Sequence, residues 1–352
     1  MTSTLRNALA RVEDPILDDD IVSLGLVGDV EVDGDTAHVP LALGAPHSPV
    51  ETRITEDVRA VVRDEGYEPV LSVEIDDTTP AGQMDGAPNV IAVSSGKGGV
   101  GKSTVSVNLA TAMAERGANV GLFDADVYGP NIPRMLGVQS ELGKAEDDET
   151  IRPVESHGLK LMSIGFLVGD ADPVIWRGAM VNKVLTELLH DTNWGDLDYF
   201  VVDLPPGTGD VQLTLLQQIG VLGALAVTTP QDISLDNARK SVRMFDKHDT
   251  SVLGVVENMS GFLCDECGTQ HDVFATGGGR RLADEFDHPL LAKIPLDPSI
   301  QESCEVGEPV VTDGDSEPAK AFRDLAEQTM DQVGRERRRS HADGAADLQP
   351  EP

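Results

Sequence analysis

The feature that most constrains this chain is a glycine-rich loop directly after a short apolar run. Residues 90–93 have the length and composition of a buried strand. The next residues match Gly-x-x-x-x-Gly-Lys-Ser from Gly96 to Ser103. Glycines let backbone N–H groups surround a phosphate, and the start of a following helix adds its positive end. The sequence therefore predicts a strand, a phosphate-binding loop and a helix in succession.

The loop predicts ATP and Mg²⁺ as ligands. Lys102 can reach the β- and γ-phosphates, and the Ser103 hydroxyl can bind Mg²⁺. The expected nucleotide-binding residues of the loop are Gly96, Lys97, Gly98, Gly99, Val100, Gly101, Lys102, Ser103 and Thr104. Among them, Lys97 is a second lysine inside the glycine run.

Apolar runs and helical stretches alternate through residues 89–333. Such alternation favours an α/β domain, with a mostly parallel sheet that helices cover on both faces. The expected strands are residues 90–93, 120–123, 160–164, 199–202, 224–227, 252–256 and 290–294.

Residues 1–76 predict a separate small α+β domain. The expected elements are strands at 27–32 and 37–43 joined by a hairpin turn, a helix at 49–63 and a strand at 70–75. Residues 77–88 have linker composition. Residues 334–352 are polar and are predicted to be a disordered tail.

The chain is strongly acidic, with 61 acidic against 27 basic residues and a net charge of −34. The acids are spread along the whole chain, which is typical of halophilic proteins with a hydrated surface. An acidic partner-binding surface is the alternative. Either way, the charge disfavours binding to nucleic acid or anionic lipid. The basic run at residues 335–339 is more simply explained as a solvated helix end than as a nucleic-acid contact.

The expected location is cytoplasmic. The N-terminus has no signal-peptide pattern, and no apolar run approaches the length of a membrane span. The three cysteines are too few for a disulfide framework.

Carboxylates follow two of the predicted strands. Asp124 and Asp126 come at the end of the second strand, where ligands bind in open α/β sheets. Capping of a turn is the alternative role for either one. Asp203 has the Walker B form, in which the carboxylate holds Mg²⁺ through water. Gly207 follows two prolines, and its backbone N–H can sense the γ-phosphate.

Two cysteines, Cys264 and Cys267, have the spacing to bind one metal ion or one cluster together. Half a zinc site and a pair of structural thiols are alternatives. Thioredoxin-like chemistry is disfavoured, because Cys264 does not begin a helix after the first strand of a βαβ unit. Cys304 is far from the pair and is predicted to be a buried, apolar-like thiol.

The loop Lys-Gly-Gly-x-x-Gly-Lys-Ser resembles the deviant phosphate loop of the MinD/ParA/nitrogenase-iron-protein class. This resemblance implies a homodimer in which Lys97 reaches the nucleotide of the facing subunit. Asp-Ala-Asp-Val-Tyr-Gly-Pro at residues 124–130 resembles switch I of the Mrp/ApbC family of iron–sulfur carrier ATPases. By that resemblance, Asp126 positions the attacking water or the metal shell.

The Mrp/ApbC resemblance extends to the C-terminal half of the chain. It includes Asn-Met-Ser-Gly-Phe at residues 258–262, the cysteine pair and the glycines at 277–279. This resemblance implies that Asn258 contacts adenine, and that Cys264 and Cys267 share a [4Fe–4S] cluster across a dimer. A structural asparagine that closes a turn is the alternative for Asn258. The resemblance also implies an ATP-hydrolysing carrier whose clients are apo iron–sulfur proteins, with no nucleic-acid or membrane partner. A MinD/ParA-like positioning ATPase, or the same fold with structural zinc at the cysteines, are the alternatives.

Residues 14–17 and 20–27 resemble the small SufT-like domain of iron–sulfur assembly proteins. That domain often has a cysteine before a proline in the loop after its second strand. The corresponding loop here, residues 44–49, has no cysteine, and His47 is interpreted as an ordinary loop histidine.

Salt dependence tests the halophilic interpretation. The Debye length shrinks from about 10 Å at 0.1 M salt to about 3 Å at 1 M, so added salt should screen repulsion between the acids. We expect the melting temperature to rise steeply with KCl into the molar range. A melting temperature that stays flat between 0.1 M and 2 M KCl would mean that the acids serve another purpose.

Overall fold

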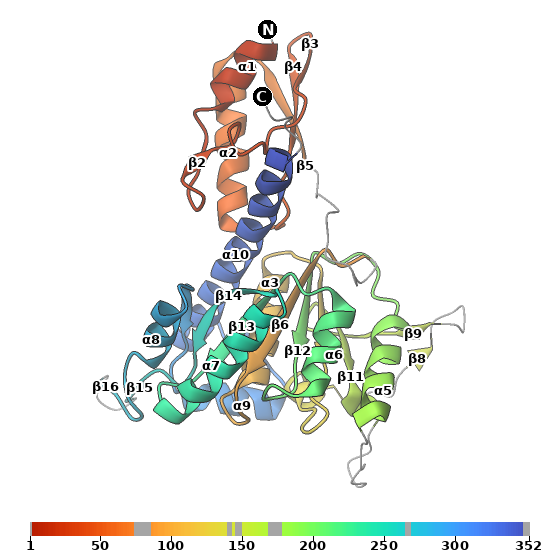
Figure 1. The fold of residues 1–352 in the computed structure, drawn as a ribbon, viewed down its shortest axis with the longest axis vertical. Helices are drawn as coiled ribbons and strands as arrows, with labels where there is room; N and C mark the ends of the chain where they lie inside the picture. The colour runs from red at the N-terminus through yellow and green to blue at the C-terminus, as the bar shows by residue number, and fades with distance from the viewer. Residues whose placement is uncertain are drawn as a thin grey trace. The chain divides into compact units, whose positions relative to one another are not determined.

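The computed structural model describes residues 2–73, 86–138, 143–144, 150–167, 178–264 and 269–347. The chain forms two compact units (Figure 1). Unit 1 combines Met1–Thr79 with Met330–Pro352, and unit 2 is Pro80–Thr329. The predicted linker at 77–88 lies mostly outside the described residues. No helix of the described chain is long and apolar enough to span a bilayer.

Unit 2 is built on an eight-stranded sheet in the order β10-β11-β7-β12-β6-β13-β14-β17. Its strands are β6 (Asn89–Ser95), β7 (Val120–Asp124), β10 (Val154–Ser156), β11 (Leu159–Ser163), β12 (Tyr199–Asp203), β13 (Gly223–Thr228), β14 (Ser251–Glu257) and β17 (Leu290–Lys293). All neighbours pair in parallel except β10 and β11. The seven predicted strands are confirmed, and the antiparallel edge strand β10 was not expected.

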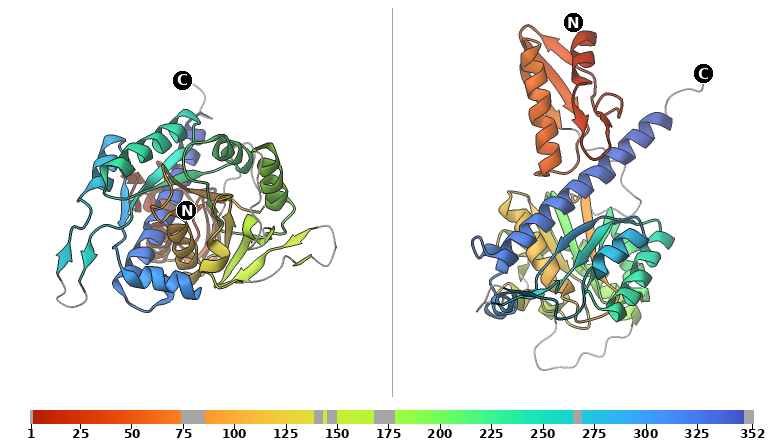
Figure 2. Two further views of the ribbon diagram at one scale, coloured as in Figure 1. Left: turned by 90° about the horizontal axis from the view of Figure 1, so that it is seen from below. Right: turned by 90° about the vertical axis from the view of Figure 1, so that its left-hand side faces the viewer.

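Helices cover both faces of this sheet (Figures 1 and 2). One face carries α3 (Lys102–Glu115) and the start of α10 (Glu317–Asp347), joined by the ion pair of Arg116 with Glu327. The other face carries α5 (Gly178–His190), α6 (Asp210–Ile219), α7 (Asp232–Lys247) and α8 (Gly278–Glu285). Every residue of β6, β7, β12 and β13 is buried, as two covered faces require.

Short elements complete unit 2. They are α4 (Ile132–Met135), α9 (Pro298–Val306), the 3₁₀ turns η1 (Ile164–Leu167) and η2 (Val310–Thr312), and the strand pairs β8 (Gly143–Lys144) with β9 (Ile151–Arg152) and β15 (Phe262–Leu263) with β16 (Gln270–His271). Because β6, β7 and β12 are parallel neighbours, their carboxyl ends place Ser95, Asp124 and Asp203 at one edge of the sheet.

Unit 1 has the predicted small α+β organisation. Its elements are α1 (Thr2–Leu9), β1 (Glu13–Asp14), β2 (Asp19–Asp20), β3 (Glu31–Asp33), β4 (Thr36–Leu41), α2 (Pro49–Asp64) and β5 (Glu68–Val73). The β3–β4 hairpin is antiparallel, and β4 pairs in parallel with β5 after the α2 crossover. The first predicted strand is shorter than expected, because Val27 makes only an isolated bridge to Leu41.

The tail is the main departure from expectation. The sequence predicts disorder over 334–352, but α10 continues to Asp347, so this prediction is wrong for 334–347. The remaining residues, 348–352, lie outside the described chain. From Met330 onwards the helix belongs to unit 1 with the N-terminal domain. The basic run is a helix segment, as expected, but its Arg338 is buried rather than solvated.

Buried charges hold this helix segment in unit 1. Arg338 Nε donates to Asp14 Oδ2 at 2.5 Å, and its Nη1 donates to Glu51 Oε1 at 2.7 Å. The Glu51 carboxylate also accepts backbone N–H groups of Gly44 and Ala45 at 3.2 and 2.8 Å. Burial raises the pKa of Glu51, and the charge of Arg338 opposes that shift. The partners of Arg338 lie 324 and 287 residues away, so local composition could not reveal them.

Replacement of Arg338 tests this arrangement. Arg338→Met leaves Asp14 and Glu51 buried without their cation, and loss of one partner of a buried ion pair costs about 3–5 kcal/mol. The neighbouring Arg339→Met is the control, because this side chain is exposed and its loss should stay within about 0.5 kcal/mol. Denaturant unfolding of the whole chain measures both. Equal stability of the two variants would contradict a stabilising role for the buried cluster.

Candidate nucleotide site and cysteine hairpin

The glycine-rich loop connects β6 to α3 and is tightly packed. Gly99 and Gly101 have φ values of +79° and +82°, a region that glycine adopts without strain. A Cβ at Gly96 would lie 2.1 Å from the carbonyl carbon of Asn237 on α7. The protein's own backbone therefore requires glycine at position 96, independently of any phosphate.

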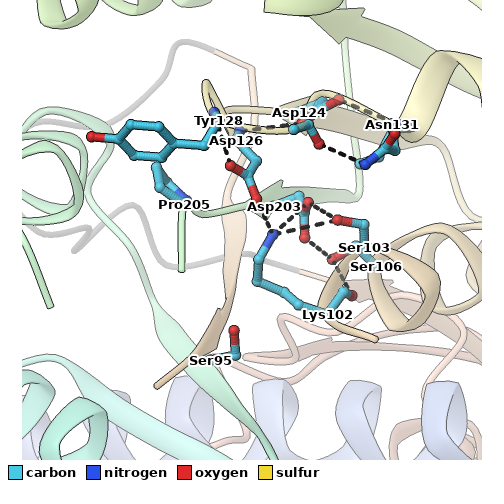
Figure 3. A network of polar contacts seen from close by, with 12 residues as sticks. Ser95, Lys102, Ser103, Ser106, Asp124, Asp126, Tyr128, Asn131, Asp203 and Pro205 are labelled. Atoms are coloured by element: carbon cyan, nitrogen blue, oxygen red, sulfur yellow. Dashed lines mark hydrogen bonds and ion pairs between the residues drawn. The ribbon is translucent and has the colours of Figure 1, made fainter. Parts of the chain in front are cut away.

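Lys102 and two carboxylates meet beneath this loop (Figure 3). Lys102 Nζ lies 2.7 Å from Asp203 Oδ2 and 3.4 Å from Asp126 Oδ2. Burial favours a lower pKa for Lys102, but the charges of Asp203 and Asp126 outweigh it and raise the pKa above its usual value. The lysine therefore carries a positive charge. Lys102, Asp126 and Asp203 come from three segments distant in sequence and form one buried cluster of charges.

Ser103 and Asp203 form a suitable donor set for Mg²⁺. The Ser103 hydroxyl donates to Asp203 Oδ2 at 2.7 Å, so a hydroxyl and a carboxylate oxygen converge. Mg²⁺ prefers such oxygens and completes its shell with water and phosphate. The residues present therefore fit the predicted ion.

Ser106 is a further residue of the cluster, and its role is not predicted by the sequence motifs. Its hydroxyl donates to Asp203 Oδ1 at 2.6 Å, so both oxygens of this carboxylate have partners from α3. The only signal in the sequence was spacing, because positions 102, 103 and 106 share one face of a helix.

Asp124 shapes the turn that follows β7. Its carboxylate accepts N–H groups of Asp126 and Ile132 and the Ser163 hydroxyl, at 3.2, 3.3 and 2.9 Å. Burial, reinforced by the charge of Asp203, raises the pKa of Asp124 to about 8. Both carboxylates accept backbone N–H groups of the turn, and Asp126 also reaches Lys102.

The turn also presents Tyr128. Its backbone N–H donates to Asp126 Oδ1 at 3.2 Å. The exposed ring of Tyr128 points away from the cluster of Lys102 and Asp203, as Figure 3 shows.

Gly207 and Asn258 make contacts that the sequence did not predict. The Gly207 N–H donates to the Ser95 carbonyl at 2.9 Å, so γ-phosphate sensing would require this bond to break. Asn258 Nδ2 donates to the Val100 carbonyl at 2.8 Å, and its Oδ1 accepts the Met259 N–H at 2.9 Å. Asn258 thus holds the phosphate loop, and its contact with adenine stays a prediction.

Lys97 and Thr104 are among the predicted site residues that lie outside the Lys102 cluster. Among the described residues, the Lys97 side chain makes no hydrogen bond or ion pair, and its carbonyl accepts the Ser95 hydroxyl at 3.0 Å. Its role toward a facing subunit stays a prediction. Thr104 lines a cavity along the loop.

That cavity of about 500 Å³ runs along the loop. Its lining includes Gly98, Gly99, Gly101, Lys102, Ser103, Thr104, Asp126, Tyr128, Arg134, Gln301, Cys304 and Glu305. Cys304 is half-buried in its wall, so the prediction of a buried, apolar-like thiol is wrong as to burial. The cavity is lined by the phosphate loop and by residues of α9, and we interpret it as the candidate nucleotide cleft.

The cysteine hairpin starts a few residues after Asn258. Strands β15 and β16 pair through Phe262 with His271, and the Cys264 N–H donates to the Thr269 carbonyl at 3.0 Å. Figure 2 shows this hairpin projecting from the sheet. Cys267 lies outside the described residues, so the geometry of the pair stays a prediction. Within the described chain, no three His, Cys, Asp or Glu side chains are placed to hold a metal ion.

Two family models match this chain, one over each of its two parts. A family model described as NUBPL iron-transfer P-loop NTPase matches residues 86–330. A second, described as iron–sulfur cluster assembly protein, matches residues 2–75.

Curated relatives match over nearly the full chain. The iron–sulfur cluster carrier protein of Synechocystis sp. is 42% identical over 94% of this chain and 98% of its own length. The protein of the same name from Deinococcus radiodurans is 43% identical over 95% of this chain and 96% of its own.

Solved structures match about two thirds of the chain. A nucleotide-binding protein from Archaeoglobus fulgidus in complex with ADP has a TM-score of 0.57 and 37% identity, covering 64% of this chain and 88% of that one. The MinD cell division protein of Aquifex aeolicus has a TM-score of 0.51 and 26% identity, covering 69% and 97%. The chain therefore belongs to the family of NUBPL-type iron-transfer P-loop NTPases, with an N-terminal iron–sulfur cluster assembly domain.

Proposed function

We propose that this protein is a cytoplasmic, homodimeric ATPase that carries a [4Fe–4S] cluster and transfers it to apo iron–sulfur proteins. The observation that most directly supports this proposal is a connection between the phosphate loop and the cysteine hairpin. Asn258 ties the phosphate loop to the end of β14, and the same backbone enters the Cys264 hairpin six residues later. A nucleotide at the loop and a cluster at the hairpin would therefore act on one continuous segment.

The proposed hydrolysis relies on exchange of partners within the Lys102 cluster. Lys102 would donate to the β- and γ-phosphates in place of Asp203 and Asp126. Bound Mg²⁺, held by Ser103 and through water by Asp203, would neutralise charge on the phosphates. Asp126, released from Lys102, would orient the attacking water.

Two further changes would complete the active state. The Gly207 N–H would leave the Ser95 carbonyl for the γ-phosphate. Lys97 from the facing subunit would add positive charge where it develops in the transition state. These contributions are positioning and charge neutralisation, which dominate phosphoryl transfer.

The two lysines should respond differently to substitution. Lys102→Ala removes the buried charge beside the phosphates and should lower hydrolysis about 100-fold or more. Lys97→Ala should retain nucleotide binding but lose hydrolysis that depends on the facing subunit. Lys183→Ala is the control, because this lysine is exposed on α5. ATP binding and phosphate release measure the two steps. Parent-like hydrolysis by Lys97→Ala would contradict the role across the dimer.

The cysteines should supply one cluster per dimer. Each chain offers one chelating pair, and a [4Fe–4S] cluster usually takes four thiolates, so two chains about a two-fold axis complete the set. We expect about four irons and four sulfides per anaerobically reconstituted dimer. Cys264→Ala and Cys267→Ala should lose them while retaining ATP binding.

Cys304→Ala is the matched control and should keep the cluster, because Cys304 lies in the nucleotide cleft. Iron and sulfide analysis of the parent beside the three variants decides the outcome. Four irons per monomer, or retention of the cluster in Cys264→Ala, would contradict the shared site. One tightly held zinc per dimer without sulfide would favour structural zinc instead.

A further inference from the structure

Gln212 is a buried amide beside residues 204–209, the segment after Asp203 that we call the switch segment. It is the third residue of α6, its side chain is only 1% exposed, and none of the motifs assigns it a role. Its Nε2 donates to the Pro205 carbonyl and makes a longer contact of 3.5 Å with the Ser94 hydroxyl of β6. The side chain therefore ties the start of α6 to both the switch segment and the sheet.

The amide of Gln212 is only partly satisfied. Within the described residues, its Oε1 is buried and accepts no hydrogen bond. Exchanging the two amide atoms would place Oε1 against the Pro205 carbonyl, which is also an acceptor. A buried acceptor without a donor is unfavourable, and in a native protein such a group calls for an explanation.

The switch segment is anchored near its start and has free donors near its end. The Leu204 N–H donates to a β6 carbonyl at 3.1 Å, and Gln212 holds the next residue. Further on, Thr208 and Gly209 are exposed, and their N–H groups donate to no group of the described chain. No described atom beyond its chain neighbours lies within 4 Å of the place that a Cβ on Gly207 would take. The proposed shift of the Gly207 N–H toward a γ-phosphate therefore has room.

We propose that Gln212 is a positioning residue for ATP hydrolysis. Its Nε2 holds the Pro205 carbonyl, so that the Gly207 N–H turns to the γ-phosphate when it leaves β6. Its Oε1 accepts the N–H of Thr208 or Gly209 in the shifted segment. The inference rests on the proposed function and adds a residue through which the γ-phosphate acts on α6. Because ADP lacks this phosphate, the second arrangement forms with ATP alone.

Removal of the amide tests this role. Gln212→Met keeps the length of the side chain but removes both the donor to Pro205 and the free acceptor. We expect kcat for ATP hydrolysis to fall about tenfold or more, because small displacements of positioning groups have effects of this size. Binding of the β,γ-imido analogue of ATP should weaken about tenfold, or about 1.4 kcal/mol, whereas ADP binding should match that of the parent. Phosphate release and calorimetry measure the two properties.

Gln217→Met is the matched control, because it makes the same change at an exposed position of the same helix. It should hydrolyse ATP and bind both nucleotides like the parent. Melting temperatures check that both variants fold. Parent-like kcat and parent-like binding of the imido analogue in a folded Gln212→Met variant would overturn the inference. Equal weakening of both nucleotides would also overturn it, since that result indicates a structural role alone.

Amide hydrogen exchange gives a second readout, in the unaltered protein. Exchange at Thr208 or Gly209 should be slower with the imido analogue bound than with ADP bound, because one of these N–H groups gains the Gln212 oxygen. Gln217→Met should keep this difference and Gln212→Met should lose it. If both amides of the parent exchange equally fast with the two nucleotides, the role of Oε1 is wrong.

The same measurements separate this inference from the proposed function. If the parent hydrolyses ATP and Gln212→Met does so equally well, the inference fails and the proposed function stands. If the parent binds neither nucleotide, the proposed function fails, and the inference fails with it.

Discussion

The nucleotide site depends on the buried ion pair between Lys102 and Asp203. Three parallel strands bring carboxylates and the phosphate loop to one edge, and a buried charge there needs an opposite charge within contact distance. The pair, together with Asp126, satisfies that need when no phosphate is bound. A nucleotide would supply negative charge to Lys102, and Mg²⁺ would supply positive charge to Asp203. The same residues can therefore exchange partners without leaving a charge buried alone.

The phosphate loop is connected to the cysteine hairpin by short hydrogen-bonded steps. Asn258 bonds the Val100 carbonyl, which places the end of β14 against the loop. Beyond it, the Ser260 N–H donates to the Ile294 carbonyl and the Leu296 N–H donates to the Gly261 carbonyl, both at 2.8 Å. These bonds join the base of the hairpin to the segment between β17 and α9.

Local patterns predicted the parts of the fold that depend on neighbours in sequence. The seven core strands and the phosphate loop were found because apolar runs and glycine spacing report burial and backbone geometry directly. Ion pairs between residues far apart in the sequence could not be predicted from local patterns. The burial of Arg338 requires Asp14 and Glu51, and without them its segment has the composition of a disordered tail.

In the candidate site, too, contacts within a motif were predicted and contacts between separate elements were not. Lys102, Ser103 and Asp203 come together as their motifs predict. The sequence could not show that Asn258 turns its amide to the loop or that Ser106 reaches Asp203, because both contacts follow from how separate elements pack. Cys304 was misjudged for a related reason, since a thiol in a cleft wall and a thiol in a core have the same local sequence.

Transfer of a cluster to an acceptor tests most directly whether the nucleotide fold and the cysteine hairpin serve one carrier function. The reconstituted dimer is mixed anaerobically with an apo-enzyme that needs a [4Fe–4S] cluster, in the presence of a chelator that removes free iron. We expect the acceptor to regain activity with the parent protein and not with Cys264→Ala treated in the same way. Equal activation by that variant, or loss of all activation once the chelator is added, would contradict it.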